Sequence, residues 1–209
     1  NKDLNSNSKM FRLLQGDVGS GKTIVSLIAC SNVITSGHQV SFMAPTEILA
    51  NQHYELAKKI LNKNFNIKLL TGKTDRKSKN EIINELKDNK INMLIGTHSL
   101  FQDKIVYKNL GLVVIDEQHK FGVKQRKALS DKGGKNCDVL VMSATPIPRT
   151  MMLTVYGDMD ISKITEKPAK RKSIITLSKP EEKINEIWPF IQNQIKNKNQ
   201  IFWVCPLIE

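Results

Sequence analysis

A glycine-rich octet, GDVGSGKT at residues 16–23, has the residue types and spacing of a phosphate-binding loop. It matches the pattern G-x-x-x-x-G-K-[ST] and lies between a predicted strand and a predicted helix, as such a loop requires. Its glycines let backbone N–H groups wrap an anion, and the following helix adds partial positive charge. Lys22 is predicted to reach the β- and γ-phosphates, and the Thr23 hydroxyl to bind Mg²⁺. The predicted nucleotide-binding residues are Gly16, Asp17, Val18, Gly19, Ser20, Gly21, Lys22 and Thr23.

Two adjacent carboxylates, Asp116 and Glu117, end the apolar run that begins at Leu112. A phosphate-binding loop needs a second strand whose end carries a carboxylate beside the magnesium. We expect Asp116 to hold Mg²⁺ through water, and Glu117 to orient and polarise the attacking water. Adjacent strand residues point to opposite sides, so the strand must end here for both to serve one site. Each carboxylate alone is as readily a surface cap, but the loop about 95 residues upstream favours the catalytic interpretation.

Short apolar runs alternate with longer amphipathic segments over the first 145 residues. Strands are predicted at 11–16, 39–45, 66–72, 92–98, 112–118 and 138–145, and helices at 22–36, 46–63 and 78–89. Near-continuous apolar strands are typical of parallel sheets that are covered on both faces. The alternation therefore predicts an α/β lobe with a mostly parallel sheet and helices on both faces.

The predicted organisation has four parts: a polar segment at 1–9, the α/β lobe at 10–165, a linker at 166–182, and the start of a truncated second lobe at 183–209. A helix is predicted over 181–200, with Pro189 delaying or kinking it, and a strand is predicted from Ile201 to Cys205.

Composition limits the class of protein without identifying it. The chain has 209 residues, 40% of them hydrophobic and 25% charged, and no apolar run long enough to span a membrane. The net charge of +12 favours a nucleic-acid partner. Only five of the 32 basic residues are arginine, however, and an AT-rich genome explains the abundant lysine equally well. Three widely spaced cysteines fit no metal or disulfide pattern, which predicts a reducing, cytoplasmic location.

Several blocks of the chain resemble, in order, the motifs of superfamily 2 helicases, whose motor lobes are RecA-like P-loop NTPase lobes. The blocks are GDVGSGKT, MAPTEILA, LLTG, IGTHSLFQ, DEQHKFGVKQR and VMSATPIPRTMMLTVYGDMDIS. The sequences of these blocks are most similar to those of the RecG family, bacterial translocases that remodel stalled forks and branched DNA junctions. The resemblance runs over roughly residues 9–209. It implies a first motor lobe and the opening of a second, without the family's N-terminal wedge domain and most of the second lobe.

The resemblance also implies roles for residues outside the phosphate loop. Ser143, Ala144 and Thr145 would link the nucleotide site to the nucleic-acid track, through contacts with Gln118 and His119. Loops along that track would grip the sugar-phosphate backbone of DNA without reading its sequence. The residues implied for this are Pro45, Thr46, Thr71, Gly72, Thr97, His98 and Ser99. Taken singly, each hydroxyl is more readily a helix cap than a DNA contact.

What the resemblance implies is an ATP-dependent DNA helicase that uses Mg²⁺, with branched or forked DNA as its partner and no membrane. The substrates would be stalled forks and Holliday junctions, in recombination and repair. The family's arginine finger belongs to the second lobe, so we expect the 209 residues alone to be nearly inactive. Two alternatives stay open: another double-stranded DNA translocase such as the transcription-repair coupling factor, and a nucleotide-switched P-loop regulatory protein.

Overall fold

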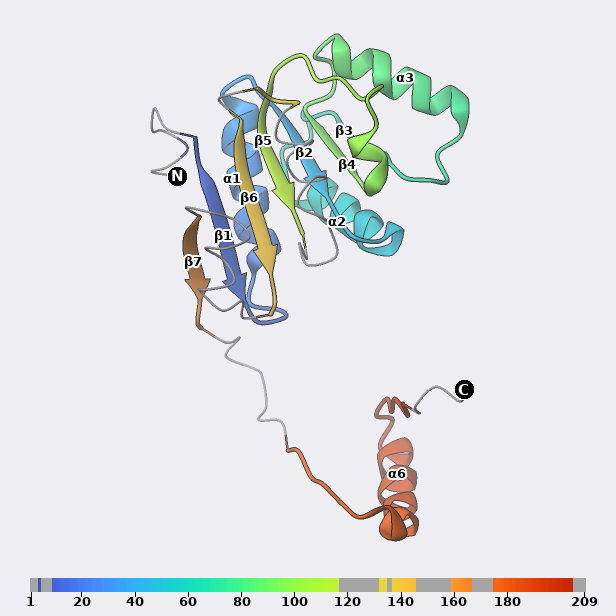
Figure 1. Ribbon diagram of the computed structural model, residues 1–209. Helices are drawn as coiled ribbons and strands as arrows, with labels where there is room; N and C mark the ends of the chain where they lie inside the picture. Colours follow the sequence, from blue (N-terminus) through green and yellow to red (C-terminus); the bar gives the residue numbers. More distant parts are fainter. Residues whose placement is uncertain are drawn as a thin grey trace. The chain divides into compact units, whose positions relative to one another are not determined.

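The computed structural model describes residues 4, 9–116, 132–134, 137–145, 159–166 and 175–204. The chain divides into two compact units, Asn1–Ala169 and Lys170–Glu209, and each is treated by itself. Figure 1 shows the first unit as a layered α/β structure, with strands running side by side and helices packed against them.

A seven-stranded sheet forms the centre of the first unit within the described residues. Its order is β3-β4-β2-β5-β6-β1-β7, and every described strand pair is parallel. The parallel α/β fold predicted from the alternation of apolar runs is therefore confirmed. The strands are β1 (Phe11–Gly16), β2 (Gln39–Met43), β3 (Ile67–Leu70), β4 (Met93–Gly96), β5 (Leu110–Ile115), β6 (Asp138–Ser143) and β7 (Asp160–Ile164).

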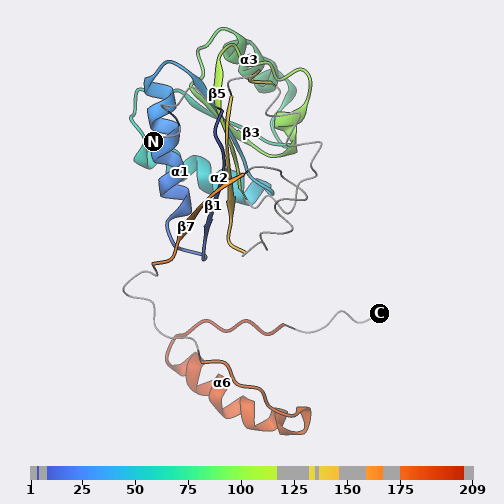
Figure 2. The ribbon, with the colours of Figure 1, turned by 60° about the vertical axis from the view of Figure 1, so that its left-hand side comes forward.

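Helices cover both faces of this sheet. Side chains alternate between the faces along each strand, so that in β6 Val141 joins one hydrophobic core while Leu140 joins the other. One core includes apolar residues of α1 and α2, and the other includes those of α3 and the short 3₁₀ helix η2. Figure 2 shows α1 to one side of the strands. The elements are α1 (Lys22–Thr35), α2 (Glu47–Ile60), α3 (Arg76–Lys87) and η2 (His98–Phe101).

The helices begin in two different ways. Thr46 caps α2, its side chain accepting a hydrogen bond from the Leu49 N–H at 3.3 Å. Asp75 caps α3 in the same way, at 2.9 Å from the Ser78 N–H, and hydrogen bonds from Ser78 hold the pKa of that carboxyl below its usual value. Helix α1 instead follows Gly21, which has no side chain to offer. The first N–H groups of α1 are thus left for another acceptor.

The edge strand β7 was not predicted. It pairs with β1 in parallel, and Arg12 of β1 reaches across to Asp160 at 3.3 Å and to the Ser162 hydroxyl at 2.9 Å. None of its five residues is buried, so its sequence carries no apolar run. Strand β7 is specified by backbone pairing with β1, which a search for hydrophobic periodicity does not detect.

In the second unit the predicted helix begins later than expected. A 3₁₀ helix, η4 (Glu181–Glu186), precedes α6 (Ile187–Lys196). Pro189 lies in the first turn of α6, where a missing N–H costs no hydrogen bond. The strand predicted from Ile201 is wrong for residues 201–204, which form no regular structure; Cys205 lies outside the described residues. Strands require a pairing partner, and the described part of this unit offers none.

The apolar residues of the second unit remain largely uncovered. No residue of α6 is buried, and the rings of Trp188 and Trp203 stack with centroids 5.5 Å apart. Among the described helices of the whole chain, none has both the length and the apolar character that crossing a membrane demands.

Candidate functional site

The glycine-rich loop turns tightly between β1 and α1. Gly19 and Gly21 have φ values of 78° and 96°, in the region that favours glycine. The Ser20 N–H donates to the Asp17 carbonyl oxygen at 3.1 Å, which closes the turn. Lys22, the first residue of α1, is buried, and its Nζ donates to the carbonyl oxygens of Gly16 at 2.7 Å and Asp17 at 3.0 Å. The loop therefore holds an ammonium group at its centre.

Three features of this loop fit a phosphate group. The N-terminus of α1 has no capping side chain, and its first turn carries no acidic residue that would repel an anion. The hydroxyl of Ser20 is buried and has no hydrogen-bond partner among the described residues. A Cβ atom at Gly16 would lie 2.5 Å from that hydroxyl and 3.3 Å from the Ile164 carbonyl oxygen, so the loop and β7 approach closely at this glycine. The predicted nucleotide-binding residues 16–23 are brought together as one anion cradle.

Asp116 lies directly after β5, two strands away from β1 in the sheet. Its backbone N–H donates to the Met43 carbonyl oxygen at 2.9 Å, which extends the pairing of β5 with β2. The side chain is buried, and its Oδ2 lies 2.7 Å from Nε2 of His53. No cluster of three or more potential metal-binding His, Cys, Asp or Glu side chains occurs in the described part of the chain. The two groups predicted to bind Mg²⁺ are the Asp116 carboxylate and the Thr23 hydroxyl. Such a small set suits this ion, which keeps several waters and takes its remaining ligands from substrate phosphates.

His53 is a site residue that the sequence reading missed. It lies on α2, buried on the same helix face as Ala50 and Ala57, and its ring packs against Phe42 with centroids 4.8 Å apart. The helical spacing from Ala50 and Ala57 was the available signal, because it placed a polar side chain on an apolar face. A buried histidine requires a partner, but spacing does not identify Asp116 as that partner.

The predicted coupling residues lie at the end of β6. Ser143 is buried, its hydroxyl 3.1 Å from that of Thr145, and its Oγ accepts from the Thr145 N–H at 3.2 Å. The Thr145 carbonyl oxygen accepts from Gln15 of β1 at 3.1 Å. Ser143, Ala144 and Thr145 therefore form a turn that is tied to the strand leading into the phosphate loop. Glu117, Gln118 and His119 lie outside the described residues, so their roles stay predictions.

The residues predicted along the DNA track follow β2, β3 and β4 in the chain, and two of them, His98 and Ser99, lie in η2. Several of their hydroxyls are engaged within the lobe: Ser99 donates to the Leu70 carbonyl oxygen at 2.8 Å, and Thr71 accepts from the Lys73 N–H at 3.3 Å. Thr71, Thr97 and Ser99 are buried, Pro45 is half-buried, and Thr46, Gly72 and His98 are exposed. Contact of these residues with DNA stays a prediction.

The sheet order separates the two groups of loops. Since all described strands are parallel, their carboxyl ends share one edge, where ligands of α/β sheets bind. The predicted track loops follow the neighbouring strands β3, β4 and β2, and the nucleotide elements follow the neighbouring strands β5, β6 and β1 (Figure 1). The boundary between the two groups lies between β2 and β5.

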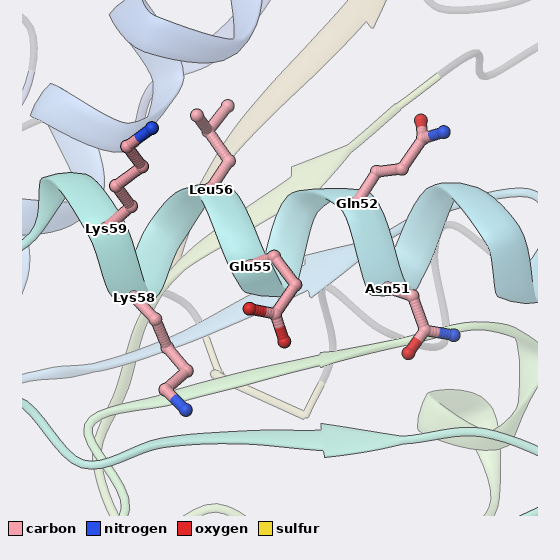
Figure 3. Close-up of a pocket in the computed structure, with 6 residues that line it drawn as sticks. All are labelled: Asn51, Gln52, Glu55, Leu56, Lys58 and Lys59. Atoms are coloured by element: carbon pink, nitrogen blue, oxygen red, sulfur yellow. The ribbon is translucent and has the colours of Figure 1, made fainter.

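A shallow depression elsewhere on the lobe has no part in this site. Figure 3 shows its lining side chains, which all project from α2 and include none of the residues of the phosphate loop. The lining residues are Asn51, Gln52, Glu55, Leu56, Lys58 and Lys59.

The parallel sheet, the phosphate loop and the carboxylate after β5 define a RecA-like P-loop nucleotide-binding lobe. The chain belongs to the DEAD/DEAH box helicase family, whose model matches residues 3–154.

Individual relatives share the full length of the chain. It is 49% identical over 210 residues to the ATP-dependent DNA helicase RecG of Aquifex aeolicus, covering 100% of this chain and 26% of that protein. It is also 49% identical to RecG of Thermotoga maritima, covering 99% and 26%, and 45% identical to RecG of Streptococcus pneumoniae, covering 99% and 31%. The chain thus spans between about a quarter and a third of the length of these relatives.

Among solved structures, that of RecG bound to a three-way DNA junction matches with a TM-score of 0.83 at 44% identity, covering 99% of this chain and 28% of that one. Mss116p bound to single-stranded RNA and AMP-PNP matches with a TM-score of 0.66 at 20% identity, covering 95% and 46%. The second likeness supports the RecA-like helicase fold alone. The expected membership of the helicase superfamily is confirmed.

Proposed function

We propose that this chain is the ATP-binding motor lobe of a DNA helicase of the RecG type, which acts on branched DNA such as stalled forks and Holliday junctions. One observation carries the proposal. A single edge of the sheet presents an anion cradle and a buried carboxylate on one half, and three polar loops on the other half. A motor that couples ATP to movement along DNA needs both surfaces on one rigid lobe. The similarity to RecG over the whole chain supports branched DNA as the substrate.

The residues of the cradle have distinct parts in this proposal. Lys22 and the first N–H groups of α1 bind the β- and γ-phosphates of ATP and neutralise their charge. Thr23 and Asp116 are the residues that would hold Mg²⁺, which when bound supplies additional positive charge at the phosphates. Glu117 orients the attacking water for in-line displacement. When the phosphates bind, the Lys22 ammonium group donates hydrogen bonds to them. These replace or join its hydrogen bonds to the Gly16 and Asp17 carbonyl oxygens.

The polar loops would bind the DNA backbone. Their exposed groups, including Thr46 and Gly72, present hydroxyl and N–H donors that phosphates accept. Contacts of this kind do not depend on base sequence, which suits a translocating motor. The net charge of +12 adds long-range attraction for DNA.

Reduced, buried Cys30 and Cys137 are in keeping with a cytoplasmic location, which stays a prediction.

The test is ATP hydrolysis by the intact protein that contains this chain, with no DNA, with linear duplex and with a three-way junction. We expect the junction to stimulate hydrolysis the most, and Lys22→Ala to abolish the stimulated rate. Equal stimulation by linear duplex and junction would favour another double-stranded DNA translocase. Hydrolysis that no DNA stimulates would overturn the motor assignment and favour a nucleotide-dependent switch.

A further inference from the structure

The pair formed by His53 and Asp116 connects the two halves of the carboxyl edge. His53 belongs to α2, which follows β2 and begins at the predicted track residue Thr46. Asp116 follows β5, the first strand of the nucleotide half. The 2.7 Å contact between Nε2 and Oδ2 is made with both side chains about nine-tenths buried. It is a side-chain link across the boundary between β2 and β5 at this edge.

Burial and packing restrict the orientations of the two hydrogen-bonded side chains. Phe42 of β2 packs against the imidazole ring of His53, which restricts its orientation. The backbone of Asp116 is fixed by its bond to Met43, so β2 and α2 hold both ends of the residue. Because the oxygens of an ionised carboxylate only accept hydrogen bonds, Nε2–H of His53 is the donor to Oδ2 of Asp116. The contact with His53 uses Oδ2 of Asp116, so Oδ1 takes no part in this hydrogen bond.

We propose that His53 is a positioning residue, which holds Asp116 in the orientation that Mg²⁺ requires and transmits movements of α2 to that carboxylate. The proposal rests on the proposed function, because it takes Asp116 as a magnesium-binding residue and Thr46 as part of the DNA track. Oδ2 of Asp116 is bonded to His53, and Oδ1 is the oxygen that would be available to Mg²⁺. Partners of this kind orient metal ligands and commonly contribute about 10- to 100-fold in metal affinity.

The same geometry gives α2 a mechanical part. If DNA contacts Thr46 and shifts the first turn of α2, His53 would shift as well. His53 lies about two turns further along the helix, which is rigid over that distance. His53 would then shift Asp116. DNA binding and magnesium–nucleotide binding are thereby coupled, and linkage requires the coupling to act equally in both directions.

The experiment measures equilibrium binding of a fluorescent ADP to the intact protein as a function of Mg²⁺ concentration, without turnover. His53→Phe keeps a ring against Phe42 and removes the donor, and His53→Gln keeps an N–H donor. His38→Phe is the matched control, because His38 is exposed and remote from the site. We expect His53→Phe to raise the half-saturating Mg²⁺ concentration by about 10- to 100-fold. ADP binding in EDTA should stay unchanged. His53→Gln should have a half-saturating Mg²⁺ concentration close to that of the wild type.

A second pair of variants keeps the test independent of folding defects. His53→Phe alone leaves a buried carboxylate unpaired, whereas Asp116→Asn and the double variant Asp116→Asn with His53→Phe carry no buried charge there. If His53 acts through Asp116, these two have the same Mg²⁺ dependence. A further loss in the double variant, or an unchanged Mg²⁺ dependence in His53→Phe, would overturn the proposal.

The coupling is read from the ratio of ADP affinities with and without a three-way junction. We expect this ratio to fall towards one in His53→Phe and to keep its wild-type value in His38→Phe. A wild-type ratio in His53→Phe overturns the link through α2. If the wild-type protein shows no Mg²⁺-dependent ADP binding at all, the proposed function itself fails, which is a different outcome from either result above.

Discussion

The Nζ atom of Lys22 lies 2.7 Å from the carbonyl oxygen of Gly16, so the loop's lysine bridges the two ends of the loop before any phosphate is bound. The ammonium group is held by carbonyl oxygens that a phosphate can replace as its partner. Lys22 thus has one part in the structure of the loop and, in the proposed function, a second part in binding nucleotide, and the two are separable by experiment.

Replacing Lys22 with alanine should abolish DNA-stimulated hydrolysis and weaken ATP binding by about 10- to 100-fold. This range follows from the contribution of a hydrogen bond to a charged group, which is about 1.5–3 kcal/mol. The fold should persist, because Asp17 is exposed to water and only the buried carbonyl oxygen of Gly16 loses a hydrogen-bond partner. We expect the apo melting temperature to fall by only a few degrees. Calorimetric titration and thermal unfolding check both statements, with Lys59→Ala as the control, because Lys59 is an exposed residue of α2. A drop of many degrees would assign Lys22 a mainly structural part.

Glu117→Gln in the intact protein should bind ATP and Mg²⁺ with nearly normal affinity but hydrolyse ATP slowly. The amide preserves the shape of the side chain and removes the charge that polarises water. Asp116→Asn should instead weaken the Mg²⁺ dependence of binding, since Asp116 is the buried carboxylate of the site. Single-turnover hydrolysis and equilibrium binding separate the two effects. Wild-type turnover by Glu117→Gln would transfer the catalytic part to another residue.

Thr46→Asp should weaken DNA binding about tenfold at low salt while leaving the lobe as stable as before. Aspartate is as good an N-cap as threonine, so the bond to the Leu49 N–H is kept. Its negative charge, however, repels a phosphate that approaches the first turn of α2. Fluorescence anisotropy with labelled junction DNA at several salt concentrations measures the loss, with Thr46→Ser as the neutral control. Unchanged affinity of Thr46→Asp would place the DNA away from this turn.

Cys30 and Cys137 should resist alkylation by iodoacetamide in the native protein at pH 8. Burial raises the pKa of the Cys137 thiol to about 12, and burial also raises that of Cys30. The reactive thiolate forms only as pH rises toward the pKa, so at pH 8 roughly one Cys137 in 10⁴ is ionised. Both should react once urea unfolds the chain. Peptide mass spectrometry distinguishes the sites, and rapid native labelling at either would show that these cores open readily.

Local sequence determined the phosphate loop and most elements of the first unit. The octet at 16–23 contains its own glycines, lysine and threonine, and its chemistry needs only a strand before it and a helix after it. The strands β4, β5 and β6 were predictable because their buried residues form nearly continuous apolar runs, and β2 was predicted although buried Gln39 and Ser41 interrupt its apolar residues. The strand predicted over 112–118 extends three residues past the end of β5 at Ile115, although the two carboxylates had indicated that it ends close to this position.

Tertiary structure decided which distant residues meet. Strand β7 has no apolar run and exists because β1 offers it an edge, whereas residues 201–204 have a strand-like composition but pair with no strand in the described part of the chain. The contact of His53 with Asp116 joins residues 63 positions apart. It depends on β2 lying beside β5 and on the rotation of α2, and neither is encoded in the local pattern around either residue. Spacing along the chain identifies candidate chemical groups, but sheet order determines which of them face each other, because hydrogen-bonded strand neighbours need not be neighbours in sequence.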